Sequence, residues 1–160
     1  MIRFEEVSGD IVKLASSIQC KHFPELSDVK VKYLFDTKKR TRGDKLVLGR
    51  CQKTNELVKY FTIEEANDAE GYQYVISLDK ITYNAIEDTD RIRLLRHELR
   101  HILVIETETK THYKIYPHNI EDFVEEIELN QDDERWSLRV AQLVQDIYDQ
   151  MEEKEDIGKE

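Results

Sequence analysis

Apolar residues follow two different spacings in the first half of the chain. In residues 8–23 they return every three or four positions, which predicts a helix with one apolar face. Residues 28–36 alternate apolar side chains with lysines, and residues 45–53 follow after a polar loop, so these two segments are predicted to pair as a hairpin. The apolar segment GYQYVISLD, residues 71–79, is predicted to add a third strand. Residues 57–70 are ambiguous and are interpreted as the end of a strand followed by an acidic loop.

The longest helical pattern lies in the second half of the chain. A helix is predicted from Asp88 to about Glu106, and apolar residues cover most of its circumference, which places it in the middle of the domain. Its one basic stripe is formed by Arg93, Arg96 and Arg100. Solvent exposure is the simplest expectation for this stripe, and a contact with an acidic partner is the alternative.

Further elements are predicted after this helix. Residues 111–118 are expected to be extended, and residues 119–129 and 133–151 to form two helices separated near NQDD. The apolar stripe of the last helix is predicted to contain Trp136, Val140, Leu143, Ile147 and Met151. A first helix, a small sheet of three to four strands, a central helix and C-terminal helices together predict an α+β fold. We expect one domain over residues 1–152 and a frayed acidic tail over residues 153–160.

Charge and composition narrow the possible partners. The net charge of the 160 residues is -10, which opposes non-specific binding to nucleic acid or to anionic lipid. The one dense basic cluster, residues 38–45, is expected to be a solvated loop. No apolar run approaches the roughly 20 residues that span a membrane, and residues 1–10 do not resemble a signal peptide. With only Cys20 and Cys51, neither a disulfide framework nor a cysteine-rich zinc cluster is supported, so a cytoplasmic protein is expected.

The segment HELRH, residues 97–101, carries the candidate chemistry. On a helix, His97 and His101 lie on one face about 6 Å apart, so both can bind a single metal ion. Glu98 lies roughly 100° further round the helix and can reach a water on that ion without being a ligand. Zinc lowers the pKa of bound water to about 7, and a neighbouring carboxylate can act as general base and then acid. The spacing therefore predicts a Zn²⁺ site with Glu98 as the catalytic residue.

A third protein ligand must come from elsewhere in the chain, because catalytic zinc usually takes three. The pattern HExxHxxGxxH is excluded, since Val104 and Thr107 occupy the positions of its glycine and last histidine. The remaining candidates for the third ligand are His112, His118, Glu121, Asp122 and Glu125.

The motifs together resemble a known family. GYQYVISLD, RLLRHELRHIL and YKIYPHNIEDF, followed by Trp136, are similar to the phage metallopeptidase family, a group of small zincin-like domains, and more distantly to SprT-like proteases. The resemblance covers residues 28–136 and implies that His118 is the third zinc ligand, with Phe123 as the aromatic residue that follows it. Asn119 departs from the aspartate common in the phage family. The resemblance implies a zinc-dependent metallopeptidase that acts on a peptide or protein substrate and is encoded by a phage or prophage in a bacterial host.

Several points stay open on the sequence alone. Tyr83, Tyr113 and Tyr116 could stabilise a developing oxyanion, although packing with the hydroxyl at the surface is the simpler explanation for each of them. The strand in residues 71–79 could pair with an extended substrate or could be an ordinary core strand. The alternative functions are a non-catalytic, zinc-stabilised interaction module and a DNA-associated SprT-like protease that uses residues 38–45. No pattern predicts the oligomeric state.

Overall fold

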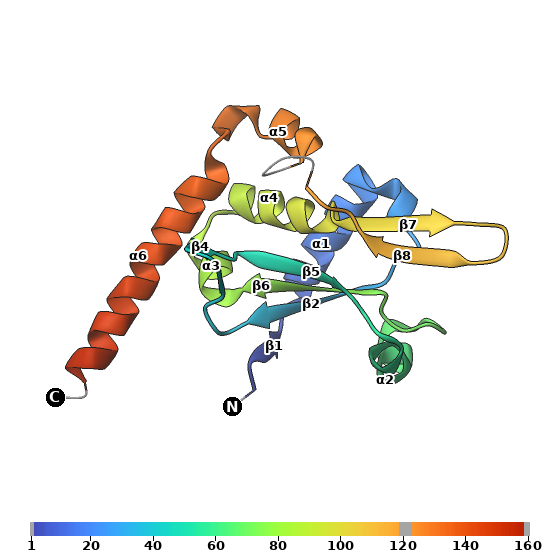
Figure 1. Cartoon of the computed structure of the whole chain (residues 1–160), viewed down its shortest axis with the longest axis horizontal. Coiled ribbons are helices and arrows are strands. Elements are labelled where there is room, and N and C mark those ends of the chain that lie inside the picture. Colours follow the sequence, from blue (N-terminus) through green and yellow to red (C-terminus); the bar gives the residue numbers. More distant parts are fainter. Residues whose placement is uncertain (1, 119–122, 159–160) are drawn as a thin grey trace.

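A four-stranded sheet organises the fold. The structure is a computed structural model that describes residues 2–118 and 123–158, and within these ranges the sheet has the order β1-β2-β6-β5 (Figure 1). Its strands are β1 (Phe4–Glu6), β2 (Val31–Asp36), β6 (Tyr74–Asp79) and β5 (Gly49–Lys53). The central strands β2 and β6 are parallel, and each edge strand is antiparallel to its neighbour. Together with the helices around it, this sheet confirms the predicted α+β fold.

The hairpin predicted between residues 28–36 and 45–53 is wrong, because β6 lies between β2 and β5. Strand β6 is almost entirely buried and is paired along both edges, which explains its nearly continuous apolar sequence. It is therefore a core strand and not an edge that could receive a substrate. The intervening loop forms a short hairpin of its own, β3 (Thr41–Arg42) with β4 (Lys45–Leu46), and turns at Gly43, whose φ is 63°.

Two helices cover one face of the sheet. Helix α1 (Gly9–His22) confirms the first predicted helix and buries Ile11, Ala15 and Ile18. It packs beside α4 (Asp88–Leu99), and both helices lie on the same side of the sheet in Figure 1. The short helix η1 (Pro24–Leu26) follows α1. The core between these layers is formed by side chains that alternate along β2 and β6, including Tyr33, Phe35, Tyr74, Ile76 and Leu78.

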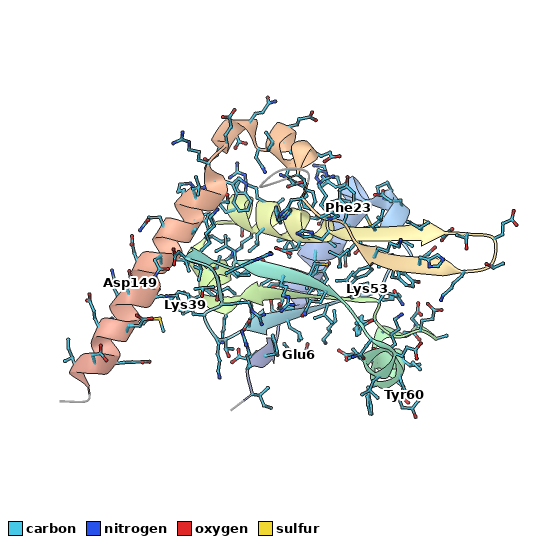
Figure 2. The ribbon with its side chains drawn as sticks, viewed as in Figure 1. Glu6, Phe23, Lys39, Lys53, Tyr60 and Asp149 are labelled. Atoms are coloured by element: carbon cyan, nitrogen blue, oxygen red, sulfur yellow. The ribbon has the colours of Figure 1, made fainter. Side chains whose placement is uncertain are left out.

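Residues 57–70, interpreted as a strand end and an acidic loop, instead contain helix α2 (Glu56–Ala66). The Asn55 side chain accepts a hydrogen bond from the Val58 N–H at 2.8 Å and caps its first turn. The helical pattern was hidden because its large apolar residues face solvent. Tyr60 and Phe61 are 70% and 73% exposed, and Tyr60 points away from the body of the protein in Figure 2.

Helix α4 ends at Leu99 and does not continue to Glu106 as predicted. Residues Ile102–Glu106 form β7, which pairs antiparallel with β8 (Thr111–Ile115), so the predicted extended segment is confirmed for its first five residues. The Tyr74 hydroxyl donates toward the backbone carbonyls of Leu103 and Lys114, at 3.2 and 2.8 Å, and ties this hairpin to the sheet. The apolar residues after His101 were predicted to continue the helix. They form a strand instead, because they pair with β8.

The C-terminal segments confirm two helices with a break between them, although residues 119–122 of the first predicted helix lie outside the described residues. The last helix extends to Ile157, so the expectation of a frayed tail over residues 153–160 is wrong for residues 153–157. Helix α5 (Val124–Leu129) and the short helix η2 (Gln131–Asp133) precede the long helix α6 (Trp136–Ile157). The buried stripe of α6 consists of Trp136, Val140, Val144 and Tyr148. The predicted stripe is therefore wrong in part: Leu143 and Met151 are each 43% exposed, because contacts recur every four residues and use a narrower face. In the described ranges, none of the helices is both long and apolar enough to cross a membrane.

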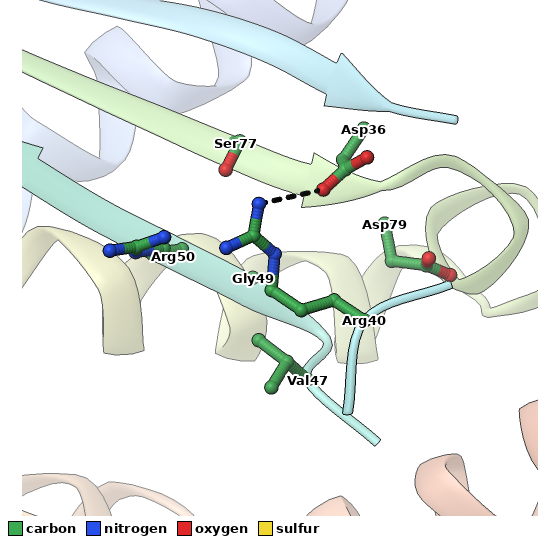
Figure 3. A pocket seen from close by; sticks show the side chains of 7 residues that line it. All are labelled: Asp36, Arg40, Val47, Gly49, Arg50, Ser77 and Asp79. Atoms are coloured by element: carbon green, nitrogen blue, oxygen red, sulfur yellow. Dashed lines mark ion pairs between the residues drawn. The ribbon is translucent and has the colours of Figure 1, made fainter. Parts of the chain in front are cut away.

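A small pocket with polar residues in its lining lies at the end of the sheet near α6. It has a volume of about 10 Å³ and lies between Asp36, Arg40 and Asp79, among others (Figure 3). Arg40 pairs with Asp36 at 3.5 Å, and the Tyr148 hydroxyl of α6 donates to Asp79, which also caps α3 (Lys80–Ala85). The basic cluster at 38–45 is therefore only partly solvated, because Arg40 forms an ion pair with the buried Asp36.

The arginine stripe of α4 is buried, which overturns the expectation of solvent exposure. Arg93 and Arg96 are 6% and 8% exposed, and Arg100 is half-buried. Their acidic partners belong to the same chain: Arg93 donates to Asp90 at 2.8 Å, and Arg96 and Arg100 donate to Glu126. The stripe therefore contacts acidic groups, but they belong to this chain and not to a separate acidic partner.

Asp90 provides a test of this network. It accepts hydrogen bonds from Arg93 at 2.8 Å and from Arg139 at 2.9 and 3.0 Å. Burial alone would raise its pKa, but the hydrogen bonds from Arg139 and Arg93 outweigh burial and lower it below 3.8. We expect Asp90→Asn to reduce the free energy of unfolding at pH 7 by about 1.5–3 kcal/mol, measured by urea denaturation.

The stability that Asp90 contributes changes with pH in a defined direction. Because the folded pKa is lowered, the stability from Asp90 is complete above the unfolded value of 3.8 and is lost as the pH falls through the folded pKa. The asparagine variant should lose this part of the acid sensitivity. Asp88→Asn is the matched control, since the Asp88 side chain is 88% exposed and should contribute less than about 1 kcal/mol. Equal effects of the two substitutions would contradict the network.

Candidate metal centre

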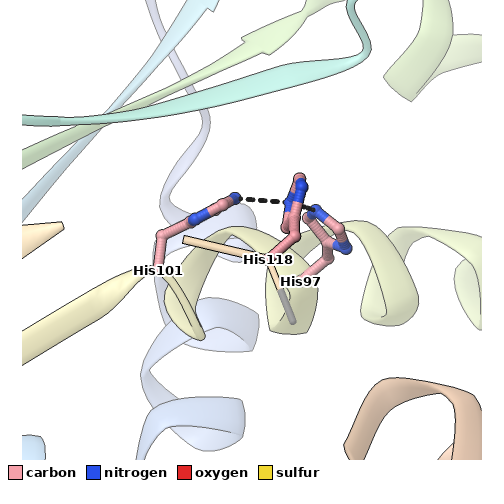
Figure 4. Close-up of side chains that lie close together, drawn as sticks. All are labelled: His97, His101 and His118. Carbon is pink, nitrogen blue, oxygen red and sulfur yellow. Dashed lines mark hydrogen bonds between the residues drawn. The ribbon is translucent and has the colours of Figure 1, made fainter. Parts of the chain in front are cut away.

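Three histidines converge beside the C-terminal end of α4. His97 lies in its last turn, His101 follows just after the helix, and His118 comes from the segment after β8. Nε2 of His118 lies 3.0 Å from Nε2 of His97 and 3.1 Å from Nε2 of His101 (Figure 4). One ligand atom from each histidine falls within 4.8 Å of the others. The structure thus brings together residues that are up to 21 positions apart in sequence.

The geometry of the nitrogens fits a tetrahedral metal ion. Two nitrogens bound to one zinc at about 2.0–2.1 Å lie roughly 3.3 Å apart, close to the spacings around His118. Nδ1 of His101 lies 2.8 Å from the Tyr116 carbonyl oxygen. A hydrogen bond from Nδ1–H to this carbonyl fixes the tautomer that carries its lone pair on Nε2, the nitrogen that faces His118. The donor set and the orientation of His101 therefore both suit a divalent metal such as zinc.

Phe123 packs against all three imidazoles. Its ring centroid lies 5.2, 4.9 and 4.9 Å from those of His97, His101 and His118, and its side chain has no exposed surface. The ring of Tyr116 stacks on that of Phe123, with the ring centroids 6.1 Å apart. Such contacts limit the rotation of the imidazoles and orient them before a metal binds.

Glu98 lies on the side of α4 that faces the edge strand β5. It is 5% exposed, and burial raises its pKa to about 7, an effect that the nearby His97 partly offsets. A methyl group added at Gly49 would lie 3.1 Å from the Glu98 carboxylate, so only glycine lets the β5 backbone come this close without displacing the side chain. Burial also raises the pKa of the Cys51 thiol, two residues further along β5, and the Glu98 carboxylate adds to that shift. The role of Gly49 could not be predicted from the sequence, because a glycine in a strand does not indicate which side chain lies against it.

An open groove lies between β5 and β8. It has a volume of about 530 Å³ and is lined by residues of β5 and by Lys114 and Ile115 of β8. Strand β5 forms one edge of the four-stranded sheet, and it borders both this groove and the Glu98 side of α4. Strand β5 therefore borders the groove with residues 50–53 and lies against Glu98 at Gly49.

The other candidate ligands lie apart from the triad or outside the described residues. His112 is paired with Ile105 in the β7–β8 hairpin, and Glu125 is an exposed residue of α5; neither belongs to the described cluster. Glu121, Asp122 and Asn119 fall in residues 119–122, outside the described ranges.

Of the three candidate oxyanion donors, the structure leaves one beside the triad. Tyr83 is buried against Phe35 at 5.7 Å, and the Tyr113 hydroxyl donates toward Glu70 at 3.3 Å. Only Tyr116 lies in the aromatic cluster around the histidines.

Comparison with known proteins gives one match. The family described as "Putative phage metallopeptidase" matches residues 2–152 of the chain. No curated protein and no solved structure matches. The matched range includes every residue of the histidine cluster together with Glu98 and Phe123.

The cluster predicts one divalent metal ion per chain. We expect purified protein to bind one equivalent of Zn²⁺ and to gain about 2.7 kcal/mol of stability when free metal is 100 times the dissociation constant. His97→Ala, His101→Ala and His118→Ala should each remove most of this gain, as measured by isothermal titration and thermal melting. His112→Ala is the control, because His112 stands outside the cluster. Retained stoichiometric binding in all three alanine variants would contradict the assignment.

Proposed function

The chain belongs to the phage metallopeptidase family, and on this premise we propose that it is a zinc-dependent peptidase with His97, His101 and His118 as ligands and Glu98 as general base. The convergence of the three imidazole nitrogens carries the proposal. Three neutral nitrogen ligands leave a fourth position for water and substrate, as catalytic zinc requires. Phage or prophage origin is implied by the family name, and action in the cytoplasm of a bacterial host is part of the proposal.

The residues of the site divide the work of peptide hydrolysis. The zinc ion would supply Lewis acidity, which lowers the pKa of water to about 7 and polarises the scissile carbonyl. Glu98 accepts a proton from the attacking water and then delivers it to the nitrogen of the leaving amine. Gly49 keeps the β5 backbone against the Glu98 carboxylate, and Tyr116 holds His101 in one tautomer through its carbonyl.

The substrate is proposed to bind as an extended strand along β5. Strand β5 has one edge paired with β6, and the groove of about 530 Å³ lies between it and β8. Main-chain hydrogen bonds to a strand edge bind peptides with little regard for side chains. This position replaces the earlier candidate in residues 71–79, because β6 is paired on both sides.

Glu98→Gln tests the proposed role of the carboxylate. The amide keeps the size of the side chain but cannot accept the proton, so we expect turnover to fall by about 10²–10⁴-fold while the bound metal is retained. Cleavage is measured by mass spectrometry on a peptide library, and metal content by elemental analysis.

Glu106→Gln is the matched control for this substitution. Glu106 is exposed on β7, and its replacement should leave turnover unchanged. A Glu98→Gln protein that cleaves at the wild-type rate would refute the general-base role. Zinc binding by a wild-type protein that cleaves nothing in the library would favour a non-catalytic, zinc-stabilised module instead.

A further inference from the structure

Two arginines of the metal helix converge on one buried carboxylate. Nε of Arg96 lies 2.8 and 3.1 Å from the two carboxylate oxygens of Glu126, and Nε of Arg100 lies 2.9 Å from Oε2. The Glu126 side chain has no exposed surface. Arg96 also donates to the Asn130 side-chain oxygen at 2.7 Å. These contacts attach α5 to α4 at two points, Glu126 and Asn130, one turn apart.

The two arginines directly precede His97 and His101, two of the three proposed metal ligands. In the segment RHELRH, Arg96 is followed by His97, and Arg100 by His101. Successive residues on a helix lie about 100° apart, so the arginines form a row next to the row of histidines. One row faces the metal centre and the other faces α5. The orientation of this helical turn is therefore constrained from both sides.

The same contact reaches the third ligand through Phe123. The carbonyl of Phe123 accepts a hydrogen bond from Ile127 N–H at 3.0 Å, which makes Phe123 the first residue of the α5 turn that carries Glu126. Its ring packs within 5.2 Å of all three imidazole centroids. His118 stands five positions before Phe123 in the chain. Fixing α5 on α4 thus fixes the aromatic ring against which His118 packs.

We propose that Glu126 is a positioning residue that clamps α5 onto the metal helix through Arg96 and Arg100 and so holds Phe123 and His118 in place for the metal. The inference rests on the proposed metal site and adds a residue that does not touch the metal. A buried carboxylate held by two arginines adopts few alternative arrangements, because moving it away from both of them would leave buried charges uncompensated. The clamp therefore orients the third ligand before the metal binds.

The experiment compares metal affinity in wild type, Glu126→Gln, His118→Ala and the double variant. Affinities for Zn²⁺ are measured by competition with a chelator, and the ligand set is followed by the absorption spectrum of bound Co²⁺. We expect Glu126→Gln to weaken binding by about 10–100-fold and to change the Co²⁺ spectrum. In the His118→Ala background the same substitution should cost less than about threefold, because the ligand that it positions is gone.

Asp132→Asn is the matched control within the same network. Asp132 pairs with Arg93 on the same arginine row, but its side chain is 67% exposed, and its replacement should change metal affinity by less than about twofold. Should Glu126→Gln fail to fold by circular dichroism, Arg100→Gln takes its place in the cycle, since Arg96 still pairs with Glu126 in that variant.

The outcomes separate this inference from the proposed function. Unchanged zinc affinity in Glu126→Gln, or a loss of the same size with and without His118, would overturn the positioning role while leaving the metal site intact. A wild-type protein that binds no metal would overturn the proposed function and this inference with it.

Discussion

Helix α4 is largely enclosed by the rest of the protein, and its buried polar side chains need partners inside the fold. Asp90, Arg93, Arg96 and Glu98 are all less than 9% exposed. A buried charge without a partner destabilises a protein by several kcal/mol, on the order of 3–5 kcal/mol when one member of a buried pair is lost. The enclosing elements therefore have to supply complementary groups for the arginines, and Glu126 pairs with two of them. Glu98 instead lies against β5 at Gly49, and burial raises its pKa.

This constraint connects the fold to the site. Arg96 and Arg100 point toward α5, and Glu98 points toward β5 at Gly49. His118 lies beside His97 and His101, and Phe123 packs against it. A centre built in this way combines three ligands from two segments with a carboxylate on a rigid helix, and rigid support is what accurate ligand geometry requires.

The sequence predicts best where one local pattern decides the outcome. The helix at α1 and the break before α6 follow from their own spacing, and HELRH with His118 identifies residues that the structure brings together. The position of β6 between β2 and β5 could not be predicted, because alternation along a strand does not name its neighbour. The apolar run after His101 is compatible with helix and with strand, and only its pairing with β8 selects the strand. Helix α2 was not predicted from the sequence, because its large apolar residues are exposed and do not form a buried face. The arginine stripe was misjudged because its acidic partners are distant in sequence; Arg96 and Glu126, for example, are 30 residues apart.

The central claim is that three imidazoles, two from the α4 region and one from beyond β8, bind one metal ion. X-ray absorption spectroscopy at the zinc edge, on protein purified without added metal, tests it most directly. We predict about one zinc per chain with three imidazole ligands at about 2.0–2.1 Å and no sulfur. A sulfur ligand at about 2.3 Å would place the metal at a cysteine such as Cys51 instead. Such a spectrum, or fewer than three imidazoles around the ion, would contradict the account.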